Sequence, residues 1–305
     1  MTDFESKVVN VKPYSPPISV ILPVYNGRKT IREAVSSILG QTFRDFEFII
    51  INDGSTDETA EILASFTDPR IRVLNQENRG FAASMNRGIM ESRGRYIARM
   101  DADDVALPER FAKQLDFLEI NPTVGVLGAA NQVVYSDGTK AVRCWPLNTA
   151  RIKKNIVRIS PVPHSVAMIR REVFDRVGLY ACVNDDANCL VFKDYDLWVR
   201  VLAAGYDMAN LPEVLMINYR EANSIMRSKS LKNLLRQRII GRMDIIKRLN
   251  LSCAEYLNII PVIILTLLNY YNIIKLDKLF SYLSNGKSQD SSLSHKALIN
   301  NNCMK

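Results

Sequence analysis

The sequence predicts an α/β protein with a doubly wound, mostly parallel sheet flanked by helices, followed by a C-terminal helical appendage. Two observations lead to this fold class. Short, continuously apolar runs alternate with helix-length segments from residue 18 onward, as expected when crossover helices cover both faces of a parallel sheet. Polar and acidic residues cluster directly after several of these runs, where parallel sheets bind their ligands.

The predicted elements follow one another in a regular order. Strands are expected at residues 18–23, 46–51, 71–74, 96–100 and 124–127, and helices at 30–39, after 57, at 81–92 and after Pro108. Beyond residue 130 the pattern is less regular, with a strand expected at 166–169 and a helix at 194–204. Residues 1–17 are expected to form a flexible arm and residues 281–305 a disordered tail.

Composition narrows the class of protein. With 47% hydrophobic and 24% charged residues, the chain of 305 residues is globular and long enough for one large domain with an appendage. The polar start predicts no signal peptide. Five cysteines without a C-x-x-C pair suggest reduced thiols and a cytoplasmic protein, not a zinc site or a disulfide framework.

The positive charge is concentrated near the C-terminus. Residues 227–248 contain eight Lys or Arg and one acid, Asp244, within a net charge of +8 for the whole chain. This concentration indicates one segment that meets an anionic surface and argues against a nucleic-acid-binding protein.

The same region has helical patterns. Residues 230–248 predict a basic amphipathic helix, and residues 257–274 an apolar helix whose uninterrupted core, 259–268, is about half of the ~20 residues needed to span a bilayer. We therefore expect residues 227–275 to lie on an anionic membrane surface. The alternative is a helical hairpin packed on the core or on a second copy of the chain in a homo-oligomer.

Three carboxylates follow the predicted strand at 96–100, namely those of Asp101, Asp103 and Asp104. So many negative charges at the end of a buried strand are unfavourable unless a cation compensates them. Mg²⁺ and Mn²⁺ take oxygen ligands and complete their coordination with water and substrate phosphates. The cluster therefore predicts a divalent metal that bridges a nucleotide phosphate, with a solvated acidic turn before a helix as the alternative.

Tyr25 and Asp53 also lie just past the ends of predicted strands, so three separate segments should converge on one edge of the sheet. No G-x-G-x-x-G follows the first strand, which excludes a dinucleotide-binding dehydrogenase.

Five motifs in order resemble those of the family 2 inverting glycosyltransferases of the GT-A fold, of the bacterial surface-polysaccharide type. The motifs are ISVILPVYN (18–26), INDGSTD (51–57), NRG (78–80), MDADD (100–104) and DYDLW (194–198). The resemblance implies a GT-A domain over residues 18–226, with a donor-binding half at about 18–128 and an acceptor half at about 129–226. Residues 227–280 would then form the basic and apolar helices.

The family pattern also implies roles for individual residues. Tyr25 would lie against the nucleotide base, Asp53 would hydrogen-bond the base, and Asp101 would face the ribose and the metal. Asp103 would coordinate the divalent metal (Mg²⁺ or Mn²⁺), and Asp194 would act as the general base, taking a proton from the acceptor hydroxyl.

One departure from the pattern concerns the base. Lys193 stands where the family commonly has Glu, and a neighbouring cation would lower the pKa of Asp194. The alternatives are that Asp196 is the base or that the enzyme is impaired.

Other polar residues have two interpretations each. His164 is either structural or near the acceptor, and Trp198 either belongs to the core or lines the acceptor pocket. Tyr219 and Arg220 either close over the diphosphate or end a strand. Arg79 and Arg99 are expected at the surface, with phosphate contact as the alternative.

These observations predict a metal-dependent inverting glycosyltransferase of the hexosyl- or N-acetylhexosaminyl-transferase class. It would transfer a sugar from a nucleotide-diphosphate sugar, expected to be a UDP-sugar, to a growing cell-surface glycan that is lipid-linked. The enzyme would lie in the cytoplasm on the inner face of the plasma membrane. A catalytically impaired glycan-binding or scaffold protein is the alternative. A sugar nucleotidyltransferase is less favoured, because no Gly-rich basic loop follows the first strand.

Overall fold

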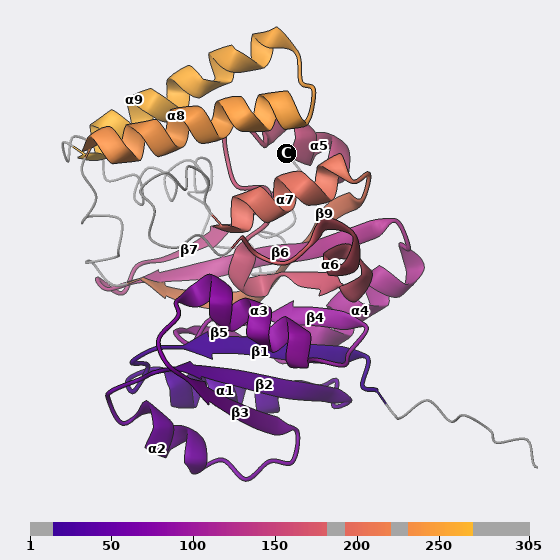
Figure 1. The fold of residues 1–305 in the computed structure, drawn as a ribbon, viewed down its shortest axis with the longest axis vertical. Coiled ribbons are helices and arrows are strands. Elements are labelled where there is room, and N and C mark those ends of the chain that lie inside the picture. Colours follow the sequence, from indigo (N-terminus) through magenta and orange to yellow (C-terminus); the bar gives the residue numbers. More distant parts are fainter. Residues whose placement is uncertain (1–14, 182–192, 221–230, 271–305) are drawn as a thin grey trace, which may run out of the picture.

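The computed structural model describes residues 15–181, 193–220 and 231–270. The expected arm (except residues 15–17) and the expected tail therefore lie outside the described residues. The described chain forms an α/β structure around one mixed sheet, with the strand order β3-β2-β1-β4-β8-β6-β9-β5 and β7 paired to β6 (Figure 1).

The first part of the chain forms the parallel part of this sheet. Its strands are β1 (Ile18–Val24), β2 (Phe46–Asp53), β3 (Ile71–Gln76) and β4 (Tyr96–Arg99). The helices between them are α1 (Ile31–Leu39), α2 (Thr59–Ala64) and α3 (Phe81–Glu91). β1 pairs in parallel with β2 and β4, and β2 pairs in parallel with β3, which is the doubly wound arrangement that the sequence predicts.

The second part adds antiparallel pairs, which the sequence pattern did not reveal. Its strands are β5 (Asp104–Ala106), β6 (Val124–Tyr135), β7 (Lys140–Arg143), β8 (Met168–Arg170) and β9 (Asp207–Arg220). Its helices are α4 (Arg110–Ile120), α5 (Thr149–Asn155), η1 (His164–Val166), α6 (Arg171–Val177) and α7 (Lys193–Ala203). β8 runs antiparallel to both β4 and β6 and so joins the two parts of the sheet. The sequence predicts a strand at 166–169, and β8 forms at Met168–Arg170, but three residues carry no signal of the direction in which a strand pairs.

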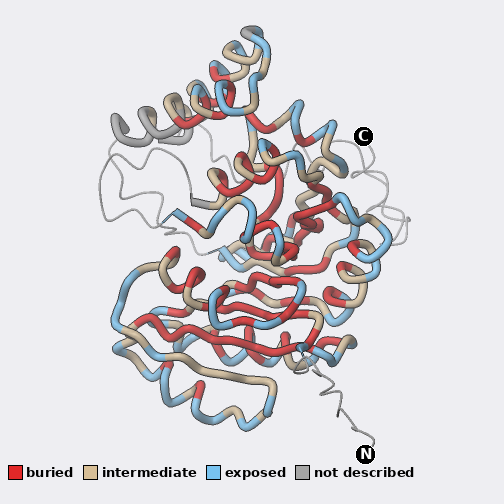
Figure 2. The backbone as a smooth tube through the Cα atoms, turned by 45° about the vertical axis from the view of Figure 1, so that its right-hand side comes forward, coloured by how far each residue is buried: buried red, intermediate tan, exposed pale blue. Residues whose placement is uncertain are grey.

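Two hydrophobic cores lie on opposite faces of the sheet, and β1 contributes to both. Ile18, Val20 and Leu22 join the core that includes α1 and α4, whereas Ile21 joins the core that includes α3 and α7. The alternation follows from the two-residue period of a strand, and it explains why β1 is apolar at successive positions. The strands form the most deeply buried layer of the molecule (Figure 2).

The C-terminal helices form a hairpin. α8 (Leu231–Arg248) and α9 (Ile259–Tyr270), joined through η3 (Cys253–Asn258), lie side by side above α7 (Figure 1). Ile245, Ile246 and Ile259 are buried in the same core as Trp198 of α7. The hairpin therefore packs on the α/β part of the chain through apolar side chains. Among the described residues, no helix is both long and apolar enough to cross a bilayer.

The structure corrects one expectation about the cysteines. Cys144 is disulfide-bonded, so the five cysteines are not all reduced. The cysteine pattern therefore carries no argument about the compartment of the protein.

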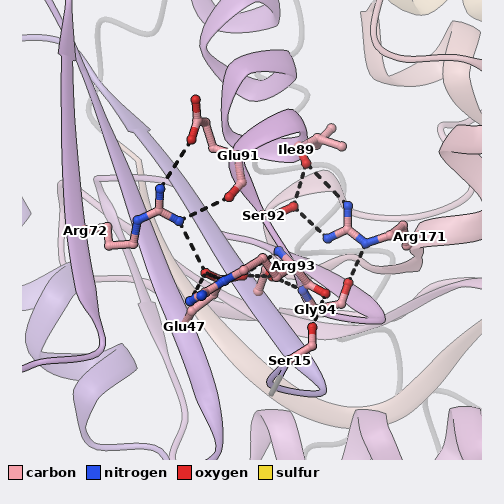
Figure 3. A network of polar contacts seen from close by, with 10 residues as sticks. Ser15, Glu47, Arg72, Ile89, Glu91, Ser92, Arg93, Gly94 and Arg171 are labelled. Carbon is pink, nitrogen blue, oxygen red and sulfur yellow. Dashed lines mark hydrogen bonds and ion pairs between the residues drawn. The ribbon is translucent and has the colours of Figure 1, made fainter. Parts of the chain in front are cut away.

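A polar network closes the sheet at the amino ends of its parallel strands, opposite the edge where ligands are expected (Figure 3). Glu47 of β2 accepts hydrogen bonds from the Ser19 hydroxyl at 2.7 Å and from the Arg93 amide at 2.6 Å, and it pairs with the Arg93 side chain at 3.2 Å. Arg171 of α6 donates to the Gly94 carbonyl at 2.7 Å. The network therefore ties β1, β2, the loop before β4 and α6 together.

We expect Glu47→Gln to lower the free energy of unfolding by about 2 kcal/mol near neutral pH, since it weakens hydrogen bonds to a buried charged group. Burial raises the pKa of Glu47, but its bonds from Ser19 and Arg93 outweigh burial and hold that pKa below 4.5. The contribution is therefore present above pH 4.5 and is lost as the pH falls through the lowered value. Urea unfolding across this range checks it, with Glu91→Gln, an exposed partner of Arg72 at 3.3 Å, as the control expected to change little. Equal losses in both variants would contradict the assignment.

Candidate functional site

The carboxyl ends of three neighbouring parallel strands form one edge of the sheet. In the strand register Val24 of β1 lies beside Asn52 of β2, and Ile21 lies beside Arg99 of β4. Asp53 is the last residue of β2, and Tyr25 and Asp101 follow the ends of β1 and β4, so the structure places the three candidate residues at the same edge. The ring of Tyr25 is 52% exposed and thus open to a flat ligand.

Side-chain hydrogen bonds join the loops after β1 and β2. Asn26 adopts a positive φ of 53°, which Asn tolerates better than most residues. Its amide donates to Ser55 Oγ at 3.0 Å, and its side-chain oxygen accepts from the Thr56 amide at 2.8 Å. The Gly27 amide donates to Thr59 Oγ1 at 2.8 Å. These bonds make the two loops one wall of a pocket of about 850 Å³ that Asp103 also lines.

Asp53 is held inside its own turn. Its carboxylate is buried and accepts from Gln76 Nε2 at 2.6 Å and from the amides of Arg79 and Gly80, both at 2.9 Å. The next residue, Gly54, has a φ of 75°, and a Cβ there would lie 2.7 Å from the Asn78 amide nitrogen. Asp53 therefore organises the turn at residues 78–80, and any bond to a ligand would use the remaining lone pair of Oδ2.

The three carboxylates after β4 converge. One oxygen from each of Asp101, Asp103 and Asp104 lies within 4.8 Å of the others. Asp103 is exposed, Asp101 is half-buried and Asp104 is buried. Asp104 accepts a hydrogen bond from Asn218 Nδ2 of β9 at 2.5 Å, so a residue far along the chain orients it.

Arg99 is buried beside this cluster. Its guanidinium is 6% exposed and pairs with the Asp101 carboxylate. It also lies 5.0 Å from the centre of the Phe81 ring. The expectation that Arg99 is a surface residue is therefore wrong, whereas Arg79 is exposed as expected. Arg110, fully buried, donates to the Arg99 carbonyl at 2.7 Å and adds a second positive charge beneath the cluster.

Even with these cations, the cluster holds excess negative charge. Burial and the charges of Asp101 and Asp103 raise the pKa of Asp104 from 3.8 to about 7, although the bond from Asn218 and the charge of Arg99 act in the opposite direction. A set of converging carboxylate oxygens with unbalanced charge fits a hard divalent ion such as Mg²⁺ or Mn²⁺. A cation there would lower the pKa of Asp104 again.

Asp194 comes from α7, almost one hundred residues later, and belongs to the same site. Burial raises its pKa above 3.8, against opposing backbone hydrogen bonds and the charge of Arg99, while the charge of Asp101 raises it further. Arg99 and Asp101 therefore lie close enough to act on Asp194. A raised pKa makes a carboxylate a stronger base near neutral pH. The side chain of Lys193 lies outside the described side chains.

Asp196, the alternative base, is engaged elsewhere. Its Oδ2 pairs with Arg200 Nε and its Oδ1 with Arg248 Nη1, each at 2.9 Å. Both oxygens of the Asp196 carboxylate are therefore engaged in ion pairs within the fold. This geometry favours Asp194 over Asp196.

His164 has a partner that the sequence could not reveal. Its Nε2 lies 2.8 Å from the hydroxyl of Tyr180, and its ring makes an edge contact with Trp198 at 5.8 Å between centroids. Burial and the charge of Arg99 lower the pKa of His164 well below 6.5, so the ring is neutral at pH 7. Trp198 is fully buried, as its core interpretation requires.

Three features of this site could not be predicted from the sequence. They are the presence of Tyr180, the presence of Asn218 and the ion pair of Arg99 with Asp101. Tyr180 and Asn218 belong to the irregular part of the chain. Asn218 contacts Asp104 from the neighbouring strand β9, and Tyr180 follows α6 and contacts His164. Tyr219 and Arg220 are the last two residues of β9, as the strand-end interpretation expects, and they line a pocket of about 290 Å³ together with Asp103 and Asp104.

Comparison with known proteins agrees with this arrangement. The family model for glycosyl transferase family 2 matches residues 19–178. EpsE of Bacillus subtilis (strain 168) is 30% identical over 248 residues, 80% of this chain and 87% of that protein. The amylovoran biosynthesis glycosyltransferase AmsE of Erwinia amylovora is 30% identical over 203 residues, 65% of this chain and 74% of that protein. The chain therefore belongs to glycosyl transferase family 2 and is a glycosyltransferase.

Solved structures confirm the GT-A fold. S. aureus TarS (residues 1–349) in complex with UDP-GlcNAc aligns with a TM-score of 0.61 at 19% identity, covering 93% of this chain and 79% of that chain. The mannosyltransferase PcManGT from Pyrobaculum calidifontis, in complex with GDP-Man and Mn²⁺, aligns with a TM-score of 0.57 at 19% identity, covering 90% and 80%.

We expect Asp104→Asn to raise the melting temperature of the metal-free protein by a few degrees at pH 8, because the amide keeps the bond from Asn218 without a buried charge. With a folded-state pKa of about 7 against 3.8, the wild type loses stability as the pH rises between these values. The advantage of the variant should grow over the same interval, in thermal melts with a chelator present.

Two further results would support this assignment. Asp103→Asn, at an exposed position, should change the melting temperature less. Saturating Mn²⁺ should reduce the difference between wild type and Asp104→Asn, because a cation bound by Asp101 and Asp103 would lower the pKa of Asp104 and stabilise its charged form. A pH-independent difference would contradict it.

Proposed function

We propose that this glycosyltransferase is metal-dependent and inverting, and that it uses a nucleotide-diphosphate sugar, most simply a UDP-sugar. The observation that carries the proposal is the convergence of Asp101, Asp103 and Asp104 with Asp194 around the buried Arg99. One acidic cluster beside a separate, strengthened base is what an inverting transfer requires.

The donor side of the site would use residues at the three strand ends. Asp103 and Asp101 would hold the divalent ion, and the exposed ring of Tyr25 would lie against the base, which Asp53 would bond. When bound, the metal would neutralise the diphosphate that leaves. The complexes of TarS with UDP-GlcNAc and of PcManGT with GDP-Man and Mn²⁺ support a nucleotide-sugar donor and a metal.

The acceptor side would use Asp194. Its carboxylate would take the proton of the acceptor hydroxyl while that oxygen bonds to the anomeric carbon, and the bond from this carbon to the diphosphate oxygen would break on the opposite face. The configuration at the anomeric carbon is thereby inverted, and no covalent enzyme intermediate forms. The charge of Arg99 would act against burial on the pKa of Asp194 and so favour the ionised form that accepts a proton.

The acceptor would be a growing polysaccharide. AmsE, a relative named for amylovoran biosynthesis, supports this class. We also propose that the acceptor is lipid-linked and that the enzyme lies peripherally on the cytoplasmic face of the membrane, through residues 227–275. The outer side of the hairpin supports membrane contact, because Leu257 is 67% exposed and Ile260 and Ile264 are each 50% exposed.

The proposed domain organisation follows from these roles. Residues 18–226 would form the GT-A domain, with donor and acceptor halves meeting near residue 128, and residues 227–280 would form the helices that contact the membrane.

The donor site can be tested by thermal shift with UDP, GDP, CDP and TDP, each with and without Mn²⁺. We expect UDP to raise the melting temperature only when Mn²⁺ is present, because a ligand that binds the folded state stabilises it by mass action. Asp103→Ala should abolish this shift. Asp116→Ala, an exposed carboxylate on α4, should keep it. A nucleotide shift that needs no metal in the wild type would contradict metal dependence.

Catalysis can be tested with Asp194→Asn. The variant should keep the Mn²⁺-dependent nucleotide shift and lose sugar-nucleotide turnover by about 100-fold or more, since general base catalysis supplies 10²–10⁴ in rate. Turnover equal to wild type would exclude Asp194 as the base. Nucleotide binding without turnover in the wild type itself would favour the catalytically impaired, glycan-binding alternative, which the Lys193 position motivates.

Membrane contact can be tested by flotation with vesicles. Wild type should float with anionic vesicles more than with neutral ones, and the double variant Ile260→Asp/Ile264→Asp should float several-fold less. Met90→Asp and Ile120→Asp are matched controls, because these exposed apolar residues (68% and 79%) lie on α3 and α4. Equal flotation of all variants would contradict the proposal, and a dimer that dissociates in the double variant would instead assign this face to a homo-oligomer.

A further inference from the structure

The Asp196 carboxylate links α7 to α8 directly, and through Arg200 it links both helices to the segment after α6. It lies on α7, two residues after Asp194, and its side chain is 15% exposed. Arg200 of the same helix and Arg248 in the last turn of α8 each take one of its oxygens, at 2.9 Å. Both acceptor atoms are therefore occupied, and α7 is joined to α8 by a charge-assisted bond.

Arg200 carries the connection to the segment before Tyr180. Its Nη1 donates to the carbonyls of Val177 at 2.5 Å and Gly178 at 3.1 Å, and its Nη2 donates to the carbonyl of Leu179 at 3.0 Å. These are the carbonyls left free at the C-terminal end of α6. The planar guanidinium bonds them while its Nε is held by Asp196, so Asp196 sets the plane of the whole group.

The segment that Arg200 holds leads directly to the proposed acceptor side. Tyr180 follows Leu179, and its backbone is bonded in both directions by Asn86 of α3, at 2.8 Å and 2.9 Å. Its hydroxyl meets His164 at 2.8 Å. The charges of Asp194 and Asp101 act on the pKa of Tyr180, which burial raises, so Tyr180 lies within electrostatic reach of the proposed base.

α8 also packs against α7, the helix that carries Asp194 and Asp196. Ile245 and Ile246 are buried against the core that contains Leu197 and Trp198 of α7. The Arg242 guanidinium lies 6.0 Å from the ring centre of Tyr195, the residue between Asp194 and Asp196. The hairpin thus contacts the helix of the base through apolar, cation–π and ionic contacts.

We propose that Asp196 is a positioning residue. Together with Arg200 and Arg248 it forms a clamp that sets Asp194 and Tyr180 at the acceptor side, and through it the C-terminal hairpin takes part in catalysis in addition to any contact with a membrane. This inference rests on the proposed role of Asp194 as the base.

The test compares Asp196→Asn and Arg248→Gln with wild type. We expect kcat to fall roughly 10- to 100-fold in Asp196→Asn, since small displacements of a reacting group cost rate in this range. A smaller fall is expected in Arg248→Gln, which leaves the Arg200 contact in place. The donor KM and the Mn²⁺-dependent nucleotide shift should stay within about twofold of wild type, because the donor residues lie on other strand ends. The double variant should be no slower than Asp196→Asn, since both changes remove the same contact.

Asp244→Asn is the matched control. Asp244 is on α8 itself and pairs with the Nε of Arg248 at 2.8 Å. Its substitution therefore removes one ion pair of the same arginine and leaves the pair between Arg248 and Asp196 of α7 in place. We expect its kcat to equal that of wild type. Arg248→Lys, which keeps the positive charge, should recover part of the activity lost in Arg248→Gln. A general loss of structure would instead lower nucleotide binding and kcat together in Asp196→Asn, and that result would overturn the positioning role.

Hydrogen exchange separates this inference from the proposed function. In Asp196→Asn the amides of residues 178–181 should exchange faster than in wild type, and in Asp244→Asn they should not. If the wild type shows no turnover, the proposed function fails. In that case the clamp is still tested by hydrogen exchange, and unchanged exchange of residues 178–181 in Asp196→Asn would overturn it. Wild-type kcat and unchanged exchange in Asp196→Asn would overturn the clamp while leaving the proposed function intact.

Discussion

The structure depends on the charge balance at the end of β4. Three carboxylates follow a strand that is buried on both faces, and Asp104 itself is almost inaccessible to water. Arg99 and Arg110 lie close to them and offset part of the charge, but burial and the charges of Asp101 and Asp103 still raise the pKa of Asp104 to about 7. An incomplete balance of this kind is the physical reason that the site suits a divalent cation, which would compensate the carboxylates.

This constraint explains the rigid surroundings of the site. Each charged residue must be held close to the opposite charge that compensates it. Hydrogen bonds therefore connect the neighbouring loops to one another. Asn26 ties the loop after β1 to that after β2, Asp53 holds the turn at 78–80, and Asn218 orients Asp104 from β9. The polar network around Glu47 closes the opposite end of the same strands, so both ends of the parallel sheet are fastened by side chains.

The C-terminal hairpin has two different faces. Its inner face packs Ile245, Ile246 and Ile259 into the core beside Trp198, and Arg248 reaches the carboxylate of Asp196. Its outer face leaves Ile260 and Ile264 half exposed. The hairpin therefore packs on the core, which was one of the two interpretations of the sequence, and the exposed residues of its outer face remain available for the proposed contact with a membrane.

The sequence by itself determined the parallel half of the sheet, the edge that carries the site and the family. Continuous apolar runs and the acids that follow them are local features of the sequence. A short, continuously apolar run is typical of a strand that is covered on both faces. The antiparallel strands, the burial of Arg99 and the partnership of His164 with Tyr180 were decided only by tertiary structure. Each depends on which segments meet in the folded chain, and neither the pairing direction of a short strand such as β8 nor the partner of a single polar residue can be read from periodicity. The same reason separates Asp194 from Asp196: two acids that look alike in sequence differ because only one of them meets two arginines.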